Sequence, residues 1–218
     1  MPADICVPSN REATVLQLYG NTRSRATRCL WMLEEIGQPY ELIERSTRAD
    51  DLQTPDYLRL NPNARIPTLV DGDLVLWESM AINLYLAQKF DGPMHCGPEI
   101  AGLASQWSIW AMLEMDGLLL DLLMHRALLA EFARDPSHAE RAELLLARPL
   151  RILNDALAAR TYLAGDGFTV ADLNVASILA WGRIARLDLS ACPHIARWLG
   201  ECLARPAYAR MRALSGRS

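Results

Sequence analysis

The segment Asn61–Leu69, with the sequence NPNARIPTL, constrains the fold of this chain more than any other stretch. The ring of Pro67 crowds Ile66 out of the helical region, so the backbone at Ile66 is expected to be extended. The N–H and C=O of Ile66 then point outward along an edge with which an extended ligand can pair. Because Arg65 adds a cation beside that edge, the segment predicts a backbone edge suited to a peptide.

A helix start follows this segment after a turn at Asp71-Gly72. Glu78 and Ser79 precede a helical pattern over 79–90. The first N–H groups of a helix have no partner within it, and the positive end of the helix dipole lies there, so this position suits a carboxylate. Together the two features fit a peptide that carries a carboxylate at each end.

Strand-like and helix-like patterns alternate over the first 90 residues. Gly37 ends the first helical pattern, and Thr54-Pro55 is typical of a helix N-cap followed by proline at the first helical position. The order β-α-β-α-β-β-α predicts a thioredoxin-like unit. Its expected strands are 15–19, 40–43, 67–70 and 74–76, and its expected helices are 25–36, 55–61 and 79–90.

Two glycine-proline pairs, Gly92-Pro93 and Gly97-Pro98, punctuate the chain, and no strand pattern recurs after them. We therefore expect an all-helical C-terminal domain. In Thr169–Asp172 the acid lies three residues after the hydroxyl, which predicts a capping box. The expected organisation is an extension over 1–13, a thioredoxin-like domain over 14–91, a linker over 92–98 and helices within 99–218, near 99–132, 137–159, 170–185, 192–203 and 206–214.

The motif Asn-Pro-x-x-Arg-Ile-Pro-x-Leu, followed by Glu-Ser before a helix, resembles the glutathione site of the cytosolic glutathione S-transferase family. Two other segments agree with it in the family's order. Leu18–Arg28 is similar to the Ser-x-x-x-Arg opening of the serine-type classes and resembles a bacterial, theta-like member. Phe168–Asp172 is similar to the folding motif of the family's helical domain. Ala64 stands where glycine is frequent, and Arg65 where lysine is frequent, which leaves the class open.

The resemblance implies that Ser24 donates a hydrogen bond to the sulfur of glutathione, here a co-substrate. Lowering the pKa of a thiol by about two units needs about 2.7 kcal/mol. A charge-assisted hydrogen bond contributes about 1.5 to 3 kcal/mol, and the helix start adds up to about 1. Alternatively, Ser24 only caps the helix. Thr22 and Tyr19 are the competing hydroxyls.

The same resemblance assigns the ends of the tripeptide. Arg65 is expected near the glycine carboxylate, and Ile66 is expected to bind through its backbone. Ser79 and Glu78 are expected at the γ-glutamyl end, unless they only form a helix cap. The family also implies a cis peptide bond before Pro67.

Other classes of site find little support. The net charge of −4 comes without a basic block, which argues against nucleic acid, and no apolar run approaches the length of a membrane span. Cys29 shares a helical face with apolar residues and is expected in the core rather than in redox chemistry. The histidines lack ligand spacing, so no metal is expected. With an odd number of scattered cysteines and no secretory signal, a cytoplasmic protein is expected.

The second substrate is expected to be a small hydrophobic electrophile held by the helical domain. The candidates for its apolar wall lie along one long helix, and core or dimer packing is expected for most of them: Trp107, Trp110, Met112, Met115 and Met124. The family also implies a homodimer, with Glu114 and Asp116 as the candidates for an acid supplied by the partner subunit. Two other functions stay open: a non-catalytic binding module, or a glutathione-dependent isomerase or dehalogenase. The isomerases' Ser-Ser-Cys opening is missing from Ser24-Arg25-Ala26.

Overall fold

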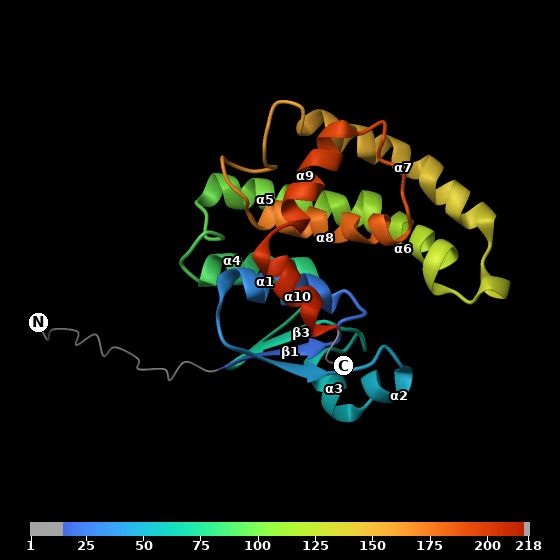
Figure 1. Ribbon diagram of the computed structural model, residues 1–218. Helices are drawn as coiled ribbons and strands as arrows, with labels where there is room; N and C mark the ends of the chain where they lie inside the picture. Colours follow the sequence, from blue (N-terminus) through green and yellow to red (C-terminus); the bar gives the residue numbers. More distant parts are fainter. Residues whose placement is uncertain (1–14, 216–218) are drawn as a thin grey trace, which may run out of the picture.

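A mixed four-stranded sheet forms the first part of the computed structural model, which describes residues 15–215 (Figure 1). The expected extension over 1–13 lies outside the described residues. The strand order is β2-β1-β3-β4; β1 pairs parallel to β2 and antiparallel to β3. The strands are β1 (Leu16–Gly20), β2 (Tyr40–Glu44), β3 (Thr68–Asp71) and β4 (Leu74–Trp77).

Local signals fix the helices of this part. Gly37 ends the first helix in the left-handed conformation, with φ of 66°. The Thr54 hydroxyl accepts a hydrogen bond from the N–H of Tyr57 at 3.4 Å, so the expected N-cap is confirmed. A single helical turn, α2, was not predicted. The helices are α1 (Ala26–Ile36), α2 (Ala49–Leu52), α3 (Pro55–Leu60) and α4 (Ser79–Lys89).

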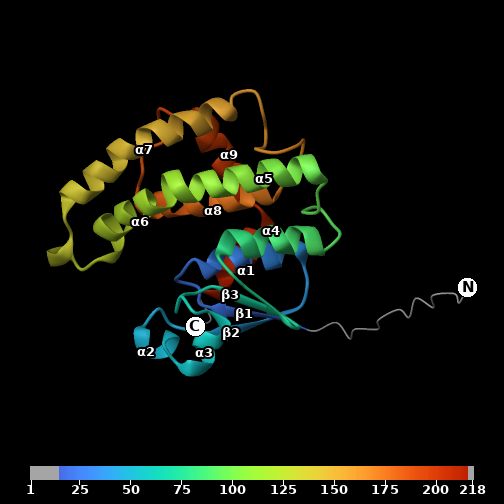
Figure 2. The ribbon, with the colours of Figure 1, turned by 180° about the vertical axis from the view of Figure 1, so that it is seen from behind.

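The remaining chain is helical, as predicted, and packs above α1 and α4 (Figures 1 and 2). The order β-α-β-α-β-β-α with a helical domain after it is thus confirmed, apart from the extra turn α2. Helices α1 and α4 separate the sheet from this second part. Its elements are α5 (Pro98–Ala111), η1 (Met112–Asp116), α6 (Gly117–Leu123), η2 (Met124–Leu128), η3 (Glu131–Ala133), α7 (Pro136–Ala156), α8 (Val170–Ile184), α9 (Pro193–Leu203) and α10 (Pro206–Leu214).

The single helix predicted over 99–132 is wrong in detail. It contains two π-helical turns, η1 and η2, and the helical run ends at Leu128. A separate 3₁₀ turn, η3, follows. No sequence pattern marks a π turn, because it only widens one turn of an otherwise regular helix.

The predicted capping box at the start of α8 is confirmed. The carboxylate of Asp172 accepts from the N–H of Thr169 at 3.0 Å, and the Thr169 hydroxyl accepts from the N–H of Ala171 at 3.2 Å. Asp172 also accepts from the N–H of Leu163 at 2.8 Å and from Nε1 of Trp198 at 2.9 Å. The cap therefore ties α8 to α9 and to the preceding loop.

A buried polar chain joins the two parts of the molecule. Asn83 of α4 donates to the side-chain oxygen of Asn174 in α8 at 2.8 Å, and Asn174 donates to the Ser108 hydroxyl of α5 at 2.8 Å. Asn83 and Asn174 are fully buried. Helix α10 returns to pack on α1, where its preceding residue Arg205 pairs with Glu35 at 2.6 Å. These contacts hold α4 and the end of α1 against the helical part.

Candidate functional site

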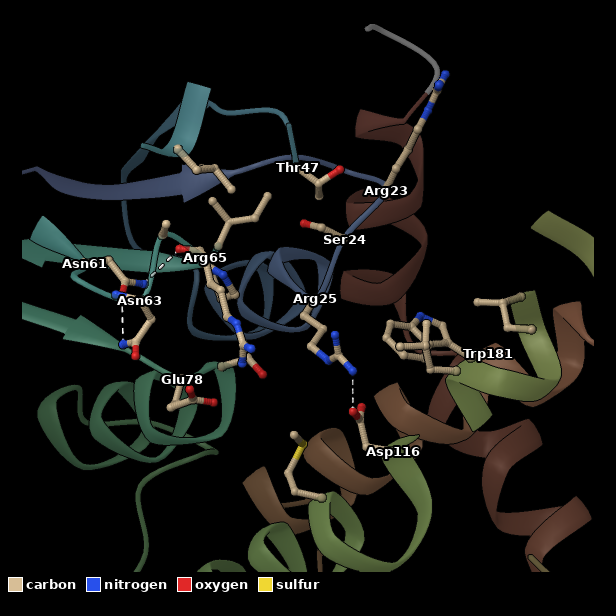
Figure 3. Close-up of a pocket in the computed structure, with 18 of the residues that line it drawn as sticks. Arg23, Ser24, Arg25, Thr47, Asn61, Asn63, Arg65, Glu78, Asp116 and Trp181 are labelled. Carbon is tan, nitrogen blue, oxygen red and sulfur yellow. Dashed lines mark hydrogen bonds and ion pairs between the residues drawn. The ribbon is translucent and has the colours of Figure 1, made fainter. Parts of the chain in front are cut away.

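A cleft of about 720 Å³ lies where the first part meets η1, α6 and η2. Figure 3 shows residues from both sides of it. The structure brings together in this cleft all five residues that the sequence singled out for glutathione, together with residues of the helical part. Among the residues that line the cleft are Ser24, Arg25, Arg65, Ile66, Glu78, Ser79, Met112, Asp116, Leu120, Leu123, Met124, Leu128 and Trp181.

The loop before β3 lies along one wall. Its Ile66–Pro67 peptide bond is cis, as the family resemblance implied. The carbonyl of Arg65 accepts from the Tyr57 hydroxyl at 2.7 Å and from the Asn61 amide at 2.8 Å, which fixes the loop. Within residues 15–215, no hydrogen bond uses the N–H or C=O of Ile66. The backbone edge at Ile66 is therefore open to a ligand.

Two residues on this wall have positive φ values although neither is glycine. Ala64 has φ of 50° and Glu78 has φ of 72°. Such conformations are unfavourable for residues with a Cβ and concentrate at ligand sites. Ala64 occupies the position where glycine is frequent in the family, and its backbone explains that preference. At Glu78 the conformation leads directly into α4, whose first residue, Ser79, is buried.

Ser24 lies just before α1, between the two walls of the cleft (Figure 3). Its hydroxyl donates to the carbonyl of Asn21 at 3.1 Å and accepts from the N–H of Ala26 at 3.2 Å. This oxygen thus already has the local partners of a helix cap. Thr22 is buried and lines a neighbouring cavity of about 400 Å³ rather than the cleft, whereas Ser24 lines both.

A charge cluster lies directly beyond Ser24. Asp116 of η1 is paired with Arg25 at 2.5 Å and with Arg28, and both guanidinium groups lie over the ring of Trp181, at 5.2 and 4.7 Å. Burial raises the pKa of Asp116, but the two cations outweigh it and hold that pKa below its ordinary value. Burial lowers the pKa of Arg28 despite the attraction of Asp116. Asp116 thus faces the cleft of its own chain.

The helical wall has an unusual periodicity. A spacing of four residues drifts by roughly 40° per step around an α-helix. Five cleft residues, each four positions after the one before, form a stripe whose first and last steps are the π turns η1 and η2. Because a π turn holds more residues than an α turn, a step of four residues there rotates in the opposite direction and cancels part of this drift. The stripe therefore stays on one face. It consists of Met112, Asp116, Leu120, Met124 and Leu128, all of which line the cleft.

Core packing is the expectation for most of the candidate wall residues, and it is confirmed for three of them. Met115 and Trp107 are buried in the core, and Trp110 packs edge-on against Trp107 at 5.2 Å rather than lining the cleft. Met112 and Met124 do line it. Sequence reasoning missed Leu120, Leu128 and Trp181. An uninterrupted α-helix would have turned Leu120 and Leu128 away from Met112 by roughly 80° and 160°.

The remaining candidates concern redox and metal chemistry. Cys29 is fully buried, and burial raises the pKa of its thiol, so its predicted place in the core is confirmed. His125 and His138 stack with ring centroids 4.7 Å apart, a proximity that their spacing did not reveal. Residues 15–215 contain no group of three or more His, Cys, Asp or Glu side chains in ligand geometry. No helix among them is long and apolar enough to span a bilayer.

A thioredoxin-like sheet joined to a helical bundle, with a cleft at the junction, defines a class of two-part proteins that bind ligands between the parts. Comparison with known families narrows this class. The family model for the N-terminal domain of glutathione S-transferase matches residues 14–88, and that for the C-terminal domain matches residues 111–206. The chain belongs to the glutathione S-transferase family, as the sequence motifs implied.

Individual relatives agree. Glutathione S-transferase 3 of Zea mays is 35% identical over 88% of this chain and 91% of its own length. A probable glutathione S-transferase of Oryza sativa subsp. japonica is 32% identical over 91% of this chain and 96% of its own. The crystal structure of the theta class enzyme from Xanthomonas axonopodis pv. citri, with glutathione bound, has a TM-score of 0.82 at 32% identity and covers 90% of this chain and 96% of that one.

Proposed function

We propose that this glutathione transferase activates the glutathione thiol through Ser24 and presents it to a small hydrophobic electrophile. The observation that carries the proposal is the single cleft in which Ser24 lies opposite Arg65, Ile66, Glu78 and Ser79. The Ser24 hydroxyl would turn from the Asn21 carbonyl to the sulfur. The start of α1 adds to the stabilisation of a thiolate.

The tripeptide would lie extended along the loop before β3. Its backbone pairs with the open edge at Ile66, its glycine carboxylate lies near Arg65, and its γ-glutamyl carboxylate meets Ser79 and the first N–H groups of α4. Glu78 takes the ammonium group. Glutathione bound to the related Xanthomonas enzyme supports this ligand. In this proposal the glutathione-binding domain covers 14–91, and the linker 92–98 leads to the electrophile-binding domain 99–218.

We also propose a serine-type, cytoplasmic enzyme that works as a homodimer. Thr22 lines a different cavity, which favours Ser24 as the hydroxyl. For the dimer, α5 ends with exposed Ile109, at 59%, and Leu113, at 79%, follows in η1, so an apolar surface is open to a partner. Sedimentation at micromolar concentration would show a dimer, and a single species near 24 kDa would reject it.

The alternative functions lack such support. A non-catalytic module would not need the intact glutathione wall, and an isomerase would need another nucleophile beside Ser24. Cys29, the nearest thiol along the chain, is buried in the core.

Ser24→Ala tests the proposal. The variant should raise the pKa of bound glutathione, followed by thiolate absorbance against pH, and cut turnover by about ten- to a thousandfold. Affinity for glutathione should change little, because the peptide is held by its ends. Thr22→Val is the matched control and should leave both quantities unchanged. A variant that melts at a lower temperature yet keeps its thiol titration and turnover would make Ser24 only a helix cap.

A further inference from the structure

The guanidinium of Arg25 lies on the electrophile side of Ser24. It comes from the residue directly after Ser24 and points down into the cleft between Ser24 and Trp181 (Figure 3). Its side chain is 35% exposed, so a ligand in the cleft can reach it. Arg65 lies on the opposite wall, with the glutathione loop. Arg23 also lines the cleft, but its side chain points away from Asp116 and Trp181 (Figure 3).

Arg25 and Arg28 differ although both pair with Asp116. Arg28 is 1% exposed and uses Nη2 on Asp116 and Nη1 on the sulfur of Met112 at 3.4 Å. Among the described residues, the Arg25 side chain has one hydrogen-bond partner, Asp116, which it reaches through Nη2. The cluster holds two cations and one anion, so a net positive charge remains. The Arg25 side chain lines the cleft and has N–H groups without a partner among the described residues.

The surroundings make that charge effective. Trp181 lies beneath it, and Leu120, Met124 and Leu128 continue the stripe beyond it. In such an apolar setting a fixed donor stabilises an anionic oxygen more strongly than it would in water. Because Asp116 holds Arg25 in place, little reorganisation is needed when charge develops.

We propose that Arg25 binds the oxygen of the electrophile and that the preferred electrophiles are α,β-unsaturated carbonyl compounds with an apolar chain. This inference rests on the proposed function of Ser24. The thiolate sulfur forms a bond to the β-carbon, and the π electrons of the C=C bond move to give an enolate. Arg25, still protonated, donates to the enolate oxygen. The α-carbon then takes a proton from water and the carbonyl re-forms.

The test compares two electrophiles of equal chain length, a straight-chain 2-alkenal and an alkyl iodide. With the iodide, the negative charge departs on the halide at the side of carbon away from sulfur. Arg25→Gln should lower kcat/KM for the alkenal by about a hundredfold, the scale for one lost oxyanion donor, and for the iodide by less than about threefold. Arg25→Lys, which keeps the charge, should recover part of the alkenal rate.

Arg59→Gln is the matched control, because Arg59 lies in α3 outside the cleft and is 71% exposed. Equal losses with both electrophiles, together with a raised pKa of the bound thiol, would mean that Arg25 acts on sulfur and would overturn the inference. Unchanged rates with both would also overturn it. If Arg25→Gln fails to fold, Arg25→Lys serves as the test. The ratio of its kcat/KM for the alkenal to that for the iodide should be lower than in the wild type, and an unchanged ratio would overturn the inference. Wild-type protein that does not bind glutathione in calorimetry would instead refute the proposed function.

Discussion

Two carboxylates buried in the helical part of the molecule, Asp116 and Asp172, are 4% and 0% exposed but lie in opposite kinds of surroundings. Asp172 accepts four hydrogen bonds from neutral donors, which belong to its own helix cap, the preceding loop and Trp198. Asp116 is held by two cations that come from the other part of the chain. One acid completes a fold, and the other organises charge at a cleft.

The comparison teaches that burial alone does not identify a functional acid. Around Asp172 every polar group is matched locally. In the Asp116 cluster, the Nε atoms of Arg25 and Arg28 are buried without a hydrogen-bond partner in the described structure. Unmatched buried groups are costly and are retained where they serve another purpose.

The largest expected effect is that of Asp116→Ala. Removing the anion leaves Arg28 buried without a counter-charge, and the loss of one partner of a buried ion pair costs about 3 to 5 kcal/mol. Denaturant unfolding would measure this loss. The double variant Arg28→Met with Asp116→Leu should recover most of it, because no unpaired charge stays inside. A double variant as unstable as Asp116→Ala would contradict this account.

Asp172→Ala should have a somewhat smaller effect. The groups that lose their acceptor are neutral, so we expect the free energy of unfolding to fall by about 2 to 3 kcal/mol. Thr169→Ala, which removes only the other half of the capping box, should cost about 1 kcal/mol. Folded Asp172→Ala protein should bind glutathione normally in calorimetry, and a large loss of affinity would show that the two regions are not independent.

The smallest expected effect is a difference in sign between the contributions that Asp116 and Asp172 make to the pH dependence of stability. The pKa of Asp116 is lowered by its cations, so its contribution to stability is present above its ordinary pKa of about 3.9 and is lost as pH falls through the folded-state pKa. Burial raises the pKa of Asp172 despite its donors, so its contribution is lost as pH rises through the folded-state pKa.

Unfolding free energies of the wild type, Asp116→Asn and Asp172→Asn between about pH 3 and pH 7 would measure these contributions. Relative to the wild type, the two variants should show slopes of opposite sign. Asp50→Asn serves as a control, because the Asp50 side chain is 67% exposed. Slopes of the same sign would contradict the opposite directions of the pKa shifts of Asp116 and Asp172.

The same contrast explains what could be predicted from the sequence. The capping box joins residues three apart, and the glutathione wall lies within the short motifs at 61–69 and 78–79, so local patterns disclosed both. Asp116 meets Arg28 and Arg25 across 88 and 91 residues of chain. No periodicity reports such a pairing. Trp181 could not be predicted for the same reason. Helix α8 is mostly buried, and no sequence pattern distinguishes its end at the cleft from the rest of the helix.

The stripe of cleft residues at every fourth position has a consequence for how an enzyme of this shape can change over evolutionary time. A π turn holds more residues than the α turn it replaces. Deleting one residue from an α-helical stretch of the wall, such as α6, would rotate the helix after it by roughly 100°. A deletion within η1, such as the 79% exposed Leu113, would instead convert the wide turn into an ordinary α turn, and the helix that follows would stay close to its present orientation. The π turns are therefore the positions at which the length of this wall could change without turning Leu120 and Met124 away from the cleft.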